Sequence, residues 1–314
     1  MNRKIALLLL ALCQPALAGQ DAPVGLGVGR PGENDDSLMP SLKFGRAAAD
    51  SDLPGYLLGT INSVYQFESD FDELPGEVSA LDFSLWSPIA HFQAGDVHIV
   101  PALGLRSTKF GTSIDNLLTE DTLYAIRMPV VVAHDLSNEW VYGGMIMPAF
   151  SGDLSQGDNF SISGAIGAAR QVNPRLMVGA GMFYSRGFED DLFLPGLAIT
   201  WRPSSRWEAF LLGPIGGVTY AINDRWIASI IGQYDALTWN IEADEDGPER
   251  DISSQAFRLG LKLERRFTDH FWVQMTGGLS MAREITIEDS DNSVLQEDEL
   301  DATPFLQLGG NFRF

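Results

Sequence analysis

The sequence is poor in cysteine, which cross-links small exported proteins through disulfides, and in histidine, which is common in catalytic and metal sites. Its 314 residues include one cysteine, Cys13, and only 4 histidines. Lys and Arg together number 21 against 42 Asp and Glu, so the formal net charge is −21 at pH 7. So acidic a chain lacks the basic surface that binds nucleic acid, and one cysteine cannot build a disulfide framework. We therefore expect no nucleic-acid partner. We also expect the stability of the protein to come from a hydrophobic core or from insertion in a membrane.

Long apolar runs are also missing beyond the first residues. No stretch of 18 or more uncharged apolar residues occurs there, which excludes a transmembrane helix. Residues 1–18 have a positive start, a short apolar run at 5–12 and the small-residue site Ala16-Leu17-Ala18. These features predict a cleaved signal peptide, with a mature chain that starts at Gly19. Lipidation of Cys13 is the alternative, although the bulky Leu12 precedes it.

Much of the remaining chain shows a period-two alternation of apolar and polar residues. In the segment 271–282, Phe271, Val273 and Met275 alternate with Trp272, Gln274 and Thr276. The segments 257–264 and 306–314 follow the same rule. Successive side chains of a strand point to opposite faces, so these segments are predicted strands with one apolar and one polar face.

Two architectures fit such strands, a soluble β-sandwich and a membrane β-barrel. Three features favour the barrel. Several segments exceed ten residues, the length needed to cross a bilayer. Short turns at 94–96, 137–139, 173–175, 204–206, 223–225 and 268–270 alternate with longer polar loops at 69–77, 113–121, 151–159, 187–191, 242–252 and 288–301. Aromatic residues, among them Trp140, Trp207 and Trp226, follow the short turns, where an interfacial girdle belongs.

The turns divide the chain into fourteen expected strands of an all-β, antiparallel, up-and-down transmembrane barrel. Their predicted spans are 55–67, 79–93, 97–110, 122–134, 140–150, 160–171, 176–186, 192–202, 207–213, 215–222, 226–241, 253–267, 271–287 and 303–314. The pair around Gly213-Pro214 is short, and without it the count is twelve. The domain prediction is a signal peptide at 1–18, a periplasmic arm or plug at 19–54 and the barrel at 55–314, with short periplasmic turns and long acidic extracellular loops.

The C-terminal strand carries a family resemblance. The chain ends in an alternating segment that includes Leu308, Phe312 and the terminal Phe314, and this resembles the assembly signal of Gram-negative outer-membrane barrels. The runs 197–207 and 222–226 resemble a family of outer-membrane barrels known only as a domain of unknown function. The resemblance implies location in the cell outer membrane and partners in outer-membrane lipid, lipopolysaccharide and the barrel-assembly machinery. It brings no catalytic residues.

Charged side chains on the predicted inward faces are the first candidate site. They are Asp82, Arg106, Arg127, Arg258, Lys262, Glu264, Glu284 and Arg313. Charges facing lipid would be costly, so the polar phase of these residues supports a lumen location. They fit either a salt-bridge network across the lumen, which we favour slightly, or a pore lining with anion preference. Arg283 faces outward in this register, which means that it lies above the lipid or that the register slips.

The acidic loops are the second candidate. Glu242, Asp244, Glu245 and Asp246 could offer several carboxylate oxygens to a divalent cation, although the spacing is not that of an EF-hand. Solubility explains the same acidity more simply.

Histidine placement argues against an enzyme. His91, His98, His134 and His270 all fall beside short turns, far from the outer leaflet, and Ser280 lies within a regular strand. No metal site or cofactor is expected. The sequence therefore predicts a non-enzymatic outer-membrane barrel that is a passive channel for small solutes or a structural barrel. A lipid-modifying hydrolase and a secreted soluble β-sandwich remain the alternatives.

Overall fold

A computed structural model describes residues 57–94, 97–113, 122–135, 140–153, 160–173, 175–186, 192–204, 206–223, 225–242, 249–268, 270–289 and 293–313. These residues form seventeen β-strands in one sheet and contain no helix. A search of the described part for a helix long and apolar enough to cross a membrane finds none. The predicted signal peptide and N-terminal arm, residues 1–54, lie outside the described residues.

The strands run in chain order around the sheet. They are β1 (Leu57–Asp70), β2 (Glu77–Pro88), β3 (Phe92–Ala94), β4 (Val97–Thr112), β5 (Thr122–Arg127), β6 (Val130–Asp135), β7 (Trp140–Gly152), β8 (Phe160–Asn173), β9 (Leu176–Arg186), β10 (Leu192–Ser204), β11 (Trp207–Leu212), β12 (Ile215–Asn223), β13 (Trp226–Glu242), β14 (Glu249–Arg266), β15 (Phe271–Asp289), β16 (Val294–Leu300) and β17 (Thr303–Arg313).

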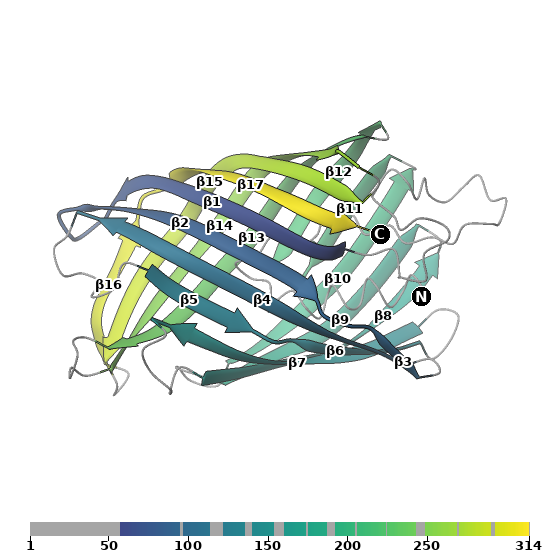
Figure 1. The fold of residues 1–314 in the computed structure, drawn as a ribbon, viewed down its shortest axis with the longest axis horizontal. Coiled ribbons are helices and arrows are strands. Elements are labelled where there is room, and N and C mark those ends of the chain that lie inside the picture. Colours follow the sequence, from purple (N-terminus) through teal and green to yellow (C-terminus); the bar gives the residue numbers. More distant parts are fainter. Residues whose placement is uncertain are drawn as a thin grey trace.

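Three of these strands continue the preceding one across a short break: β3 continues β2, β6 continues β5 and β17 continues β16. The seventeen strands therefore form a wall of fourteen spans. Strands β2 and β3 both pair with β4, β5 and β6 both pair with β4 and β7, and β16 and β17 both pair with β15. Antiparallel pairing of β1 with β17 closes the ring, from Leu57↔Arg313 to Gln66↔Phe305. The predicted antiparallel up-and-down barrel of fourteen strands is confirmed, and the closed ring excludes the sandwich (Figure 1).

The two ends of the barrel differ as the sequence predicts. Tight connections join the strands at one end, here called the short-turn end, where Asn223 accepts a hydrogen bond from the Arg225 amide at 2.9 Å. The other end, here called the long-loop end, holds the β1–β2 connection and β16, at the left of Figure 1, whereas the C terminus lies at the right. The β11–β12 connection, also at the long-loop end, is a tight turn at Gly213-Pro214, where Gly213 has a φ of 59°.

Aromatic side chains mark two levels on the outer surface. Near the short-turn end, ring pairs form between Trp140 and Tyr142, Trp207 and Tyr220, and Phe271 and Phe312. About ten residues further along the strands, a second level holds the ring pairs Tyr65–Phe67, Phe150–Phe160 and Tyr184–Phe193. Exposed apolar side chains fill the band between them, Leu261 being 68% exposed. Two aromatic girdles around an apolar band are the exterior of a membrane-spanning barrel.

On one side the wall rises well above the second girdle. Strands β13, β14 and β15 have 17, 18 and 19 residues, whereas β11 and β12 have 6 and 9. We call the raised part the crown; it comprises residues 68–80, 107–112, 122–125, 235–242, 249–256, 282–289 and 294–300. Its residues correct two predictions. The expected loop at 242–252 includes the end of β13 at Glu242 and the start of β14 at 249–252, and the expected loop at 288–301 includes the end of β15 and all of β16.

The crown reverses the polarity of the wall below it. On β14, the outward positions change from Leu261 and Leu259 below to Ser253 above, while the inward positions change from Lys262 and Arg258 to the buried Ile252. The lower part is thus apolar outside and polar inside, and the crown is polar outside and apolar inside. Water on the outside of the crown and lipid on the outside of the lower wall account for both patterns.

Candidate functional site

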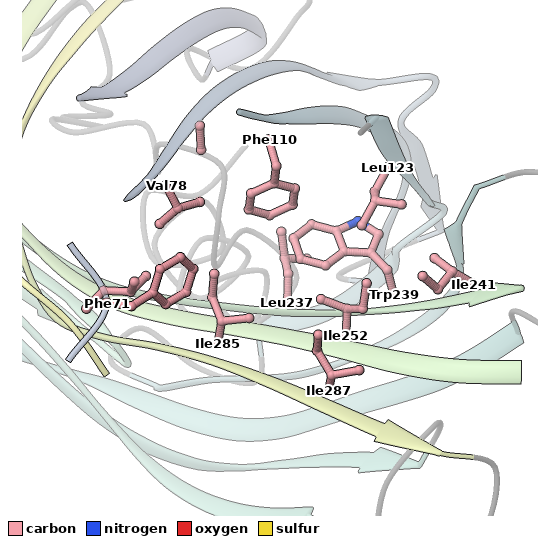
Figure 2. Close-up of a cluster of buried hydrophobic side chains, with 12 residues drawn as sticks. Phe71, Val78, Phe110, Leu123, Leu237, Trp239, Ile241, Ile252, Ile285 and Ile287 are labelled. Atoms are coloured by element: carbon pink, nitrogen blue, oxygen red, sulfur yellow. The ribbon is translucent and has the colours of Figure 1, made fainter. Parts of the chain in front are cut away.

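The interior of the crown is filled by an apolar core. Phe110 and Trp239 meet edge to face with ring centroids 5.8 Å apart, and Leu237, Ile252 and Ile285 surround them (Figure 2). These side chains come from strands on facing sides of the ring, β4 on one side and β13, β14 and β15 on the other. Burial of such side chains stabilises a fold by about 1.5–3 kcal/mol each. This apolar core is therefore a structural closure of the barrel axis at the long-loop end.

A seam between β7 and β13 completes this closure. Asn240 of β13 pairs in parallel with Gly152 of β7, although five strands separate β7 from β13 along the chain. The Ser151 hydroxyl donates a hydrogen bond to the Thr238 carbonyl oxygen at 2.9 Å. At this level, β13, β14, β15, β16, β1, β2, β4, β5 and β7 form a smaller ring around the apolar core, and β8 to β12 lie outside it.

A buried charge quartet lies directly below the core. Arg106 of β4 contacts Asp82 of β2 at 2.8 Å and Asp235 of β13 at 3.2 Å. Arg258 of β14 contacts Asp82 at 3.2 Å and Asp235 at 3.1 Å, and the Thr108 hydroxyl donates to Asp82 at 2.6 Å. Two arginines and two aspartates thus neutralise one another across the interior. The predicted cross-lumen salt-bridge network exists, built around Asp82, Arg106 and Arg258.

Little space remains between the quartet and the core. The cavity there has a volume of about 20 Å³, and its lining includes Asp82, Arg106, Phe110 and Trp239. Such a volume holds about one water molecule. The side chains that line this cavity leave no room in it for a larger solute.

A ladder of polar contacts continues toward the short-turn end. Lys262 lies 3.6 Å from Glu264, and Asn311 donates to Glu264 at 3.1 Å and to Gln274 at 2.9 Å. Gln274 in turn donates to Asn62 at 2.6 Å. All five side chains are buried, so the predicted pair Lys262 and Glu264 faces the interior. These five side chains bind one another. An anion-selective lining would instead present a row of unpaired cations, and these residues do not form one.

The remaining predicted lumen charges have different positions. Arg127 is half-buried on the inward face of β5. The prediction for Glu284 is wrong, because Arg283 is the buried, inward residue and donates to the Ser69 hydroxyl. The register slips at Ala282, which has a φ of 46° and sits in a bulge opposite β14. The side chain of Arg313 lies outside the described residues.

Several buried charged residues escaped the sequence reasoning, and three of them form ion pairs inside the wall. Asp235 completes the quartet, and Arg202 of β10 contacts Glu208 of β11 inside the wall. Asp235 lies in a segment that is apolar at most positions, so alternation in the sequence does not show which face of this strand is polar. Arg202 and Glu208 both fall on the inward positions of their strands by period-two alternation. The sequence pattern could therefore have identified them as residues that face the interior.

The side of the ring formed by β8 to β12 is unlike the crown. Gly196 of β10 shares the inward face with Leu194, Ala198 and Thr200, and an added Cβ at Gly196 would meet no atom within 4 Å. Leu194, two residues further toward the long-loop end, is 48% exposed although it faces inward. Among the described residues, none fills the space next to Gly196 on the inner face of β10.

The other predicted sites receive little support from the described residues. His91 and His98 stack at the short-turn end, with Nε2 of His91 3.0 Å from Nδ1 of His98. Among the side chains that the structure describes, no three His, Cys, Asp or Glu gather into a metal site. The acidic cation loop falls outside the described part at Asp244, Glu245 and Asp246, and the Glu242 side chain is not described either.

The C-terminal strand faces lipid as its pattern requires. Leu308 and Phe312 are exposed on the outward face of β17, and Phe314 lies outside the described residues. Their part in assembly stays a prediction.

The comparisons with known proteins point to one family. Residues 111–314, more than half of the chain, match the family described as "Domain of unknown function (DUF6268)". The chain belongs to this family. The DUF6268 match begins at the end of β4, so the first three spans precede it. No curated protein matches the chain.

Solved structures similar to this DUF6268 chain are outer-membrane channels and porins. The COG4313 outer membrane channel from Pseudomonas putida F1 is 10% identical with a TM-score of 0.45, covering 85% of this chain and 99% of its own. The NanC porin is 10% identical with a TM-score of 0.38 and coverages of 82% and 100%. The P. putida toluene transporter TodX is 9% identical with a TM-score of 0.37 and coverages of 87% and 91%. With TM-scores below 0.5, no property of these proteins is transferred to this chain.

Proposed function

We propose that this DUF6268 protein is a non-enzymatic barrel of the cell outer membrane that lets small solutes pass passively. The apolar band between two aromatic girdles supports the location, with the short turns in the periplasm and the crown above the outer leaflet. The observation that carries the passage function is the unfilled interior beside β10, where Leu194 is half-exposed on the inward face.

Access along the axis is closed in this conformation. The apolar core, the seam and the charge quartet fill the interior over the crown side, with room for about one water molecule. The protein therefore differs from a general porin, whose wide lumen is open to water. The same filled crown favours a second candidate, a purely structural barrel with no passage.

Conductance of purified protein in planar lipid bilayers separates the two candidates. Passage predicts stepwise conductance or protein-dependent uptake of an apolar dye by liposomes. Trp239→Ala should raise conductance because it removes the largest side chain of the crown core. Trp207→Ala is the matched control, since Trp207 is exposed in the girdle at the short-turn end. The channel function is rejected if wild type and Trp239→Ala give no conductance and liposomes containing either take up sugars and apolar dyes no faster than protein-free liposomes.

A further inference from the structure

The hydrogen-bonded wall is incomplete between β10 and β13. Strand β11 pairs with β10 only from Ala198 toward the short-turn end, so Leu192 to Gly196 of β10 have no partner in β11. Strand β12 pairs with β13 only up to Gln233, whereas β13 continues to Glu242. Strands β11 and β12 thus end below the upper ends of their neighbours β10 and β13. Above β11 and β12, the longer strands β10 and β13 face each other across a space.

The edges of this gap are well defined. Its floor is the β11–β12 turn, where the Gly213 amide donates to the Leu197 carbonyl at 2.9 Å and the Tyr234 amide donates to the Pro214 carbonyl at 3.0 Å. Its upper limit on β13 is the seam at Thr238 and Asn240. Three inter-strand spacings separate β10 from β13, which makes the gap about 14 Å wide at its floor.

The gap opens at the level of the second aromatic girdle. Phe193 of β10, which packs against Tyr184 with ring centroids 4.8 Å apart, is exposed on the outer surface beside it. On the other edge, Tyr234 is the last aromatic outward residue of β13, and Ala236, Thr238 and Asn240 follow it on that face. The gap therefore lies at the boundary between lipid and water.

The interior behind the gap is apolar on the side formed by β10, β11 and β12. Leu194 and the open position Gly196 face it from β10, and Leu212 and Ile215 line the inner face just below the floor. On the other edge, the buried Gln233 and Asp235 of β13 face the interior at the level of the floor, and Arg106 and Arg258 neutralise Asp235. Arg202 and Glu208 neutralise each other lower in the wall.

On the basis of the proposed passage function, we propose that this gap is a lateral mouth through which small apolar or amphipathic solutes pass between the outer membrane surface and the barrel interior. The apolar side of the lining offers no replacement for the water shell of an ion or a sugar, whereas it accepts an apolar solute at low cost. Asp235 on the other side is already paired with Arg106 and Arg258. The crown closes the axial route, so the lateral mouth is the route for such solutes.

Uptake of the apolar dye N-phenyl-1-naphthylamine by intact Gram-negative cells that express the protein tests this route. Gly196→Trp places an indole in the open space behind the gap and should lower protein-dependent uptake at least fivefold. Gly277→Trp is the matched control, because Gly277 lies on the lipid-facing side of β15 and its Cβ would also meet no atom within 4 Å. Heat-shifted gel mobility establishes that equal amounts of each variant are folded.

A thiol variant makes the test independent of whether Gly196→Trp folds. In a Cys13→Ser background, Gly196→Cys should react with a membrane-impermeant maleimide added to intact cells, and labelling should reduce dye uptake at least fivefold in the same folded protein. Gly277→Cys should remain unlabelled.

Three outcomes overturn the lateral mouth and leave the passage function standing. They are dye uptake that neither Gly196 variant changes, a Gly196→Cys thiol that the maleimide does not reach, and conductance without any protein-dependent dye uptake. Wild type that gives neither conductance nor uptake of dye or sugar overturns the passage function, and the lateral mouth with it.

Discussion

Asn240 of β13 and Gly152 of β7 pair through their backbones across the ring, and this contact divides the barrel into a filled crown and an unfilled side. It forms because β13 continues nine residues beyond its last pair with β12, so its upper edge has no neighbour in chain order. An unpaired strand edge binds another strand readily. The β7 end provides that partner and closes the apolar core from the side.

The seam should loosen when its side-chain hydrogen bond is removed. Ser151→Ala deletes the donor to the Thr238 carbonyl and should lower the free energy of unfolding by about 1 kcal/mol. Hydrogen exchange should speed up for the amides at 235–241 of β13. The amides at 227–233, which face complete partners on both sides, serve as the internal control. Unchanged exchange in both segments would mean that the seam does not hold the edge.

The charge quartet should respond strongly to the loss of one carboxylate. Asp82→Asn leaves the Arg106 and Arg258 guanidinium groups with one shared aspartate and should cost about 3–5 kcal/mol of unfolding free energy. Asp70→Asn, at an exposed position, should cost close to nothing. The double variant Asp82→Leu/Arg106→Leu should recover most of the loss, since an apolar pair leaves no uncompensated charge. Urea unfolding in detergent micelles measures all three, and an additive double variant contradicts the quartet.

The bulge at Ala282 makes a backbone prediction. Ala282 has a φ of 46°, where a β-branched side chain is strongly disfavoured. Ala282→Val should therefore lower the free energy of unfolding by about 1–2 kcal/mol, while Ala282→Gly should be tolerated. Ala228→Val, at an outward position of the regular strand β13, should change stability by less than about 0.5 kcal/mol. Equal stability of the two valine variants would contradict the bulge.

The histidine pair at the short-turn end should make stability depend on pH. Partial burial lowers the pKa of His91 below its usual value of 6.5. The folded state then binds fewer protons than the unfolded state, so stability is full above pH 6.5 and falls as the pH drops from 6.5 toward the lowered pKa. Below that pKa no further loss occurs from this group. His91→Gln should flatten the profile of urea midpoints between pH 8 and 5, and a profile unchanged by the substitution would contradict the assignment.

Much of the fold follows from the sequence because turn residues and alternation are local signals. Asn223 and Arg225 mark a turn by themselves, and Leu259 and Leu261 mark an outward face. The crown was not predictable in this way, because its inward Leu237 and Trp239 look like lipid-facing residues when lipid is assumed along the whole strand. The register shift that turns Arg283 inward on β15 depends on the positive φ of Ala282. The alternation of apolar and polar residues cannot show at which residue such a shift occurs.

The interior was only partly predictable for a related reason. Asp82, Arg106 and Arg258 share an inward phase in the sequence, but their partner Asp235 comes from a mostly apolar strand. The unfilled side depends on the differing lengths of β10 to β13, a relation among four strands. No single segment carries that information.

The central claim is that polarity reverses along the outer surface, with lipid against the lower wall and water against the crown. Spin labels at Leu261→Cys and Ser253→Cys, both on the outward face of β14, test it most directly in proteoliposomes of the Cys13→Ser protein. The account predicts that the label at 261 collides mainly with oxygen and that the label at 253 collides mainly with a water-soluble nickel chelate. Labels that both collide mainly with the nickel chelate, or both mainly with oxygen, would contradict it.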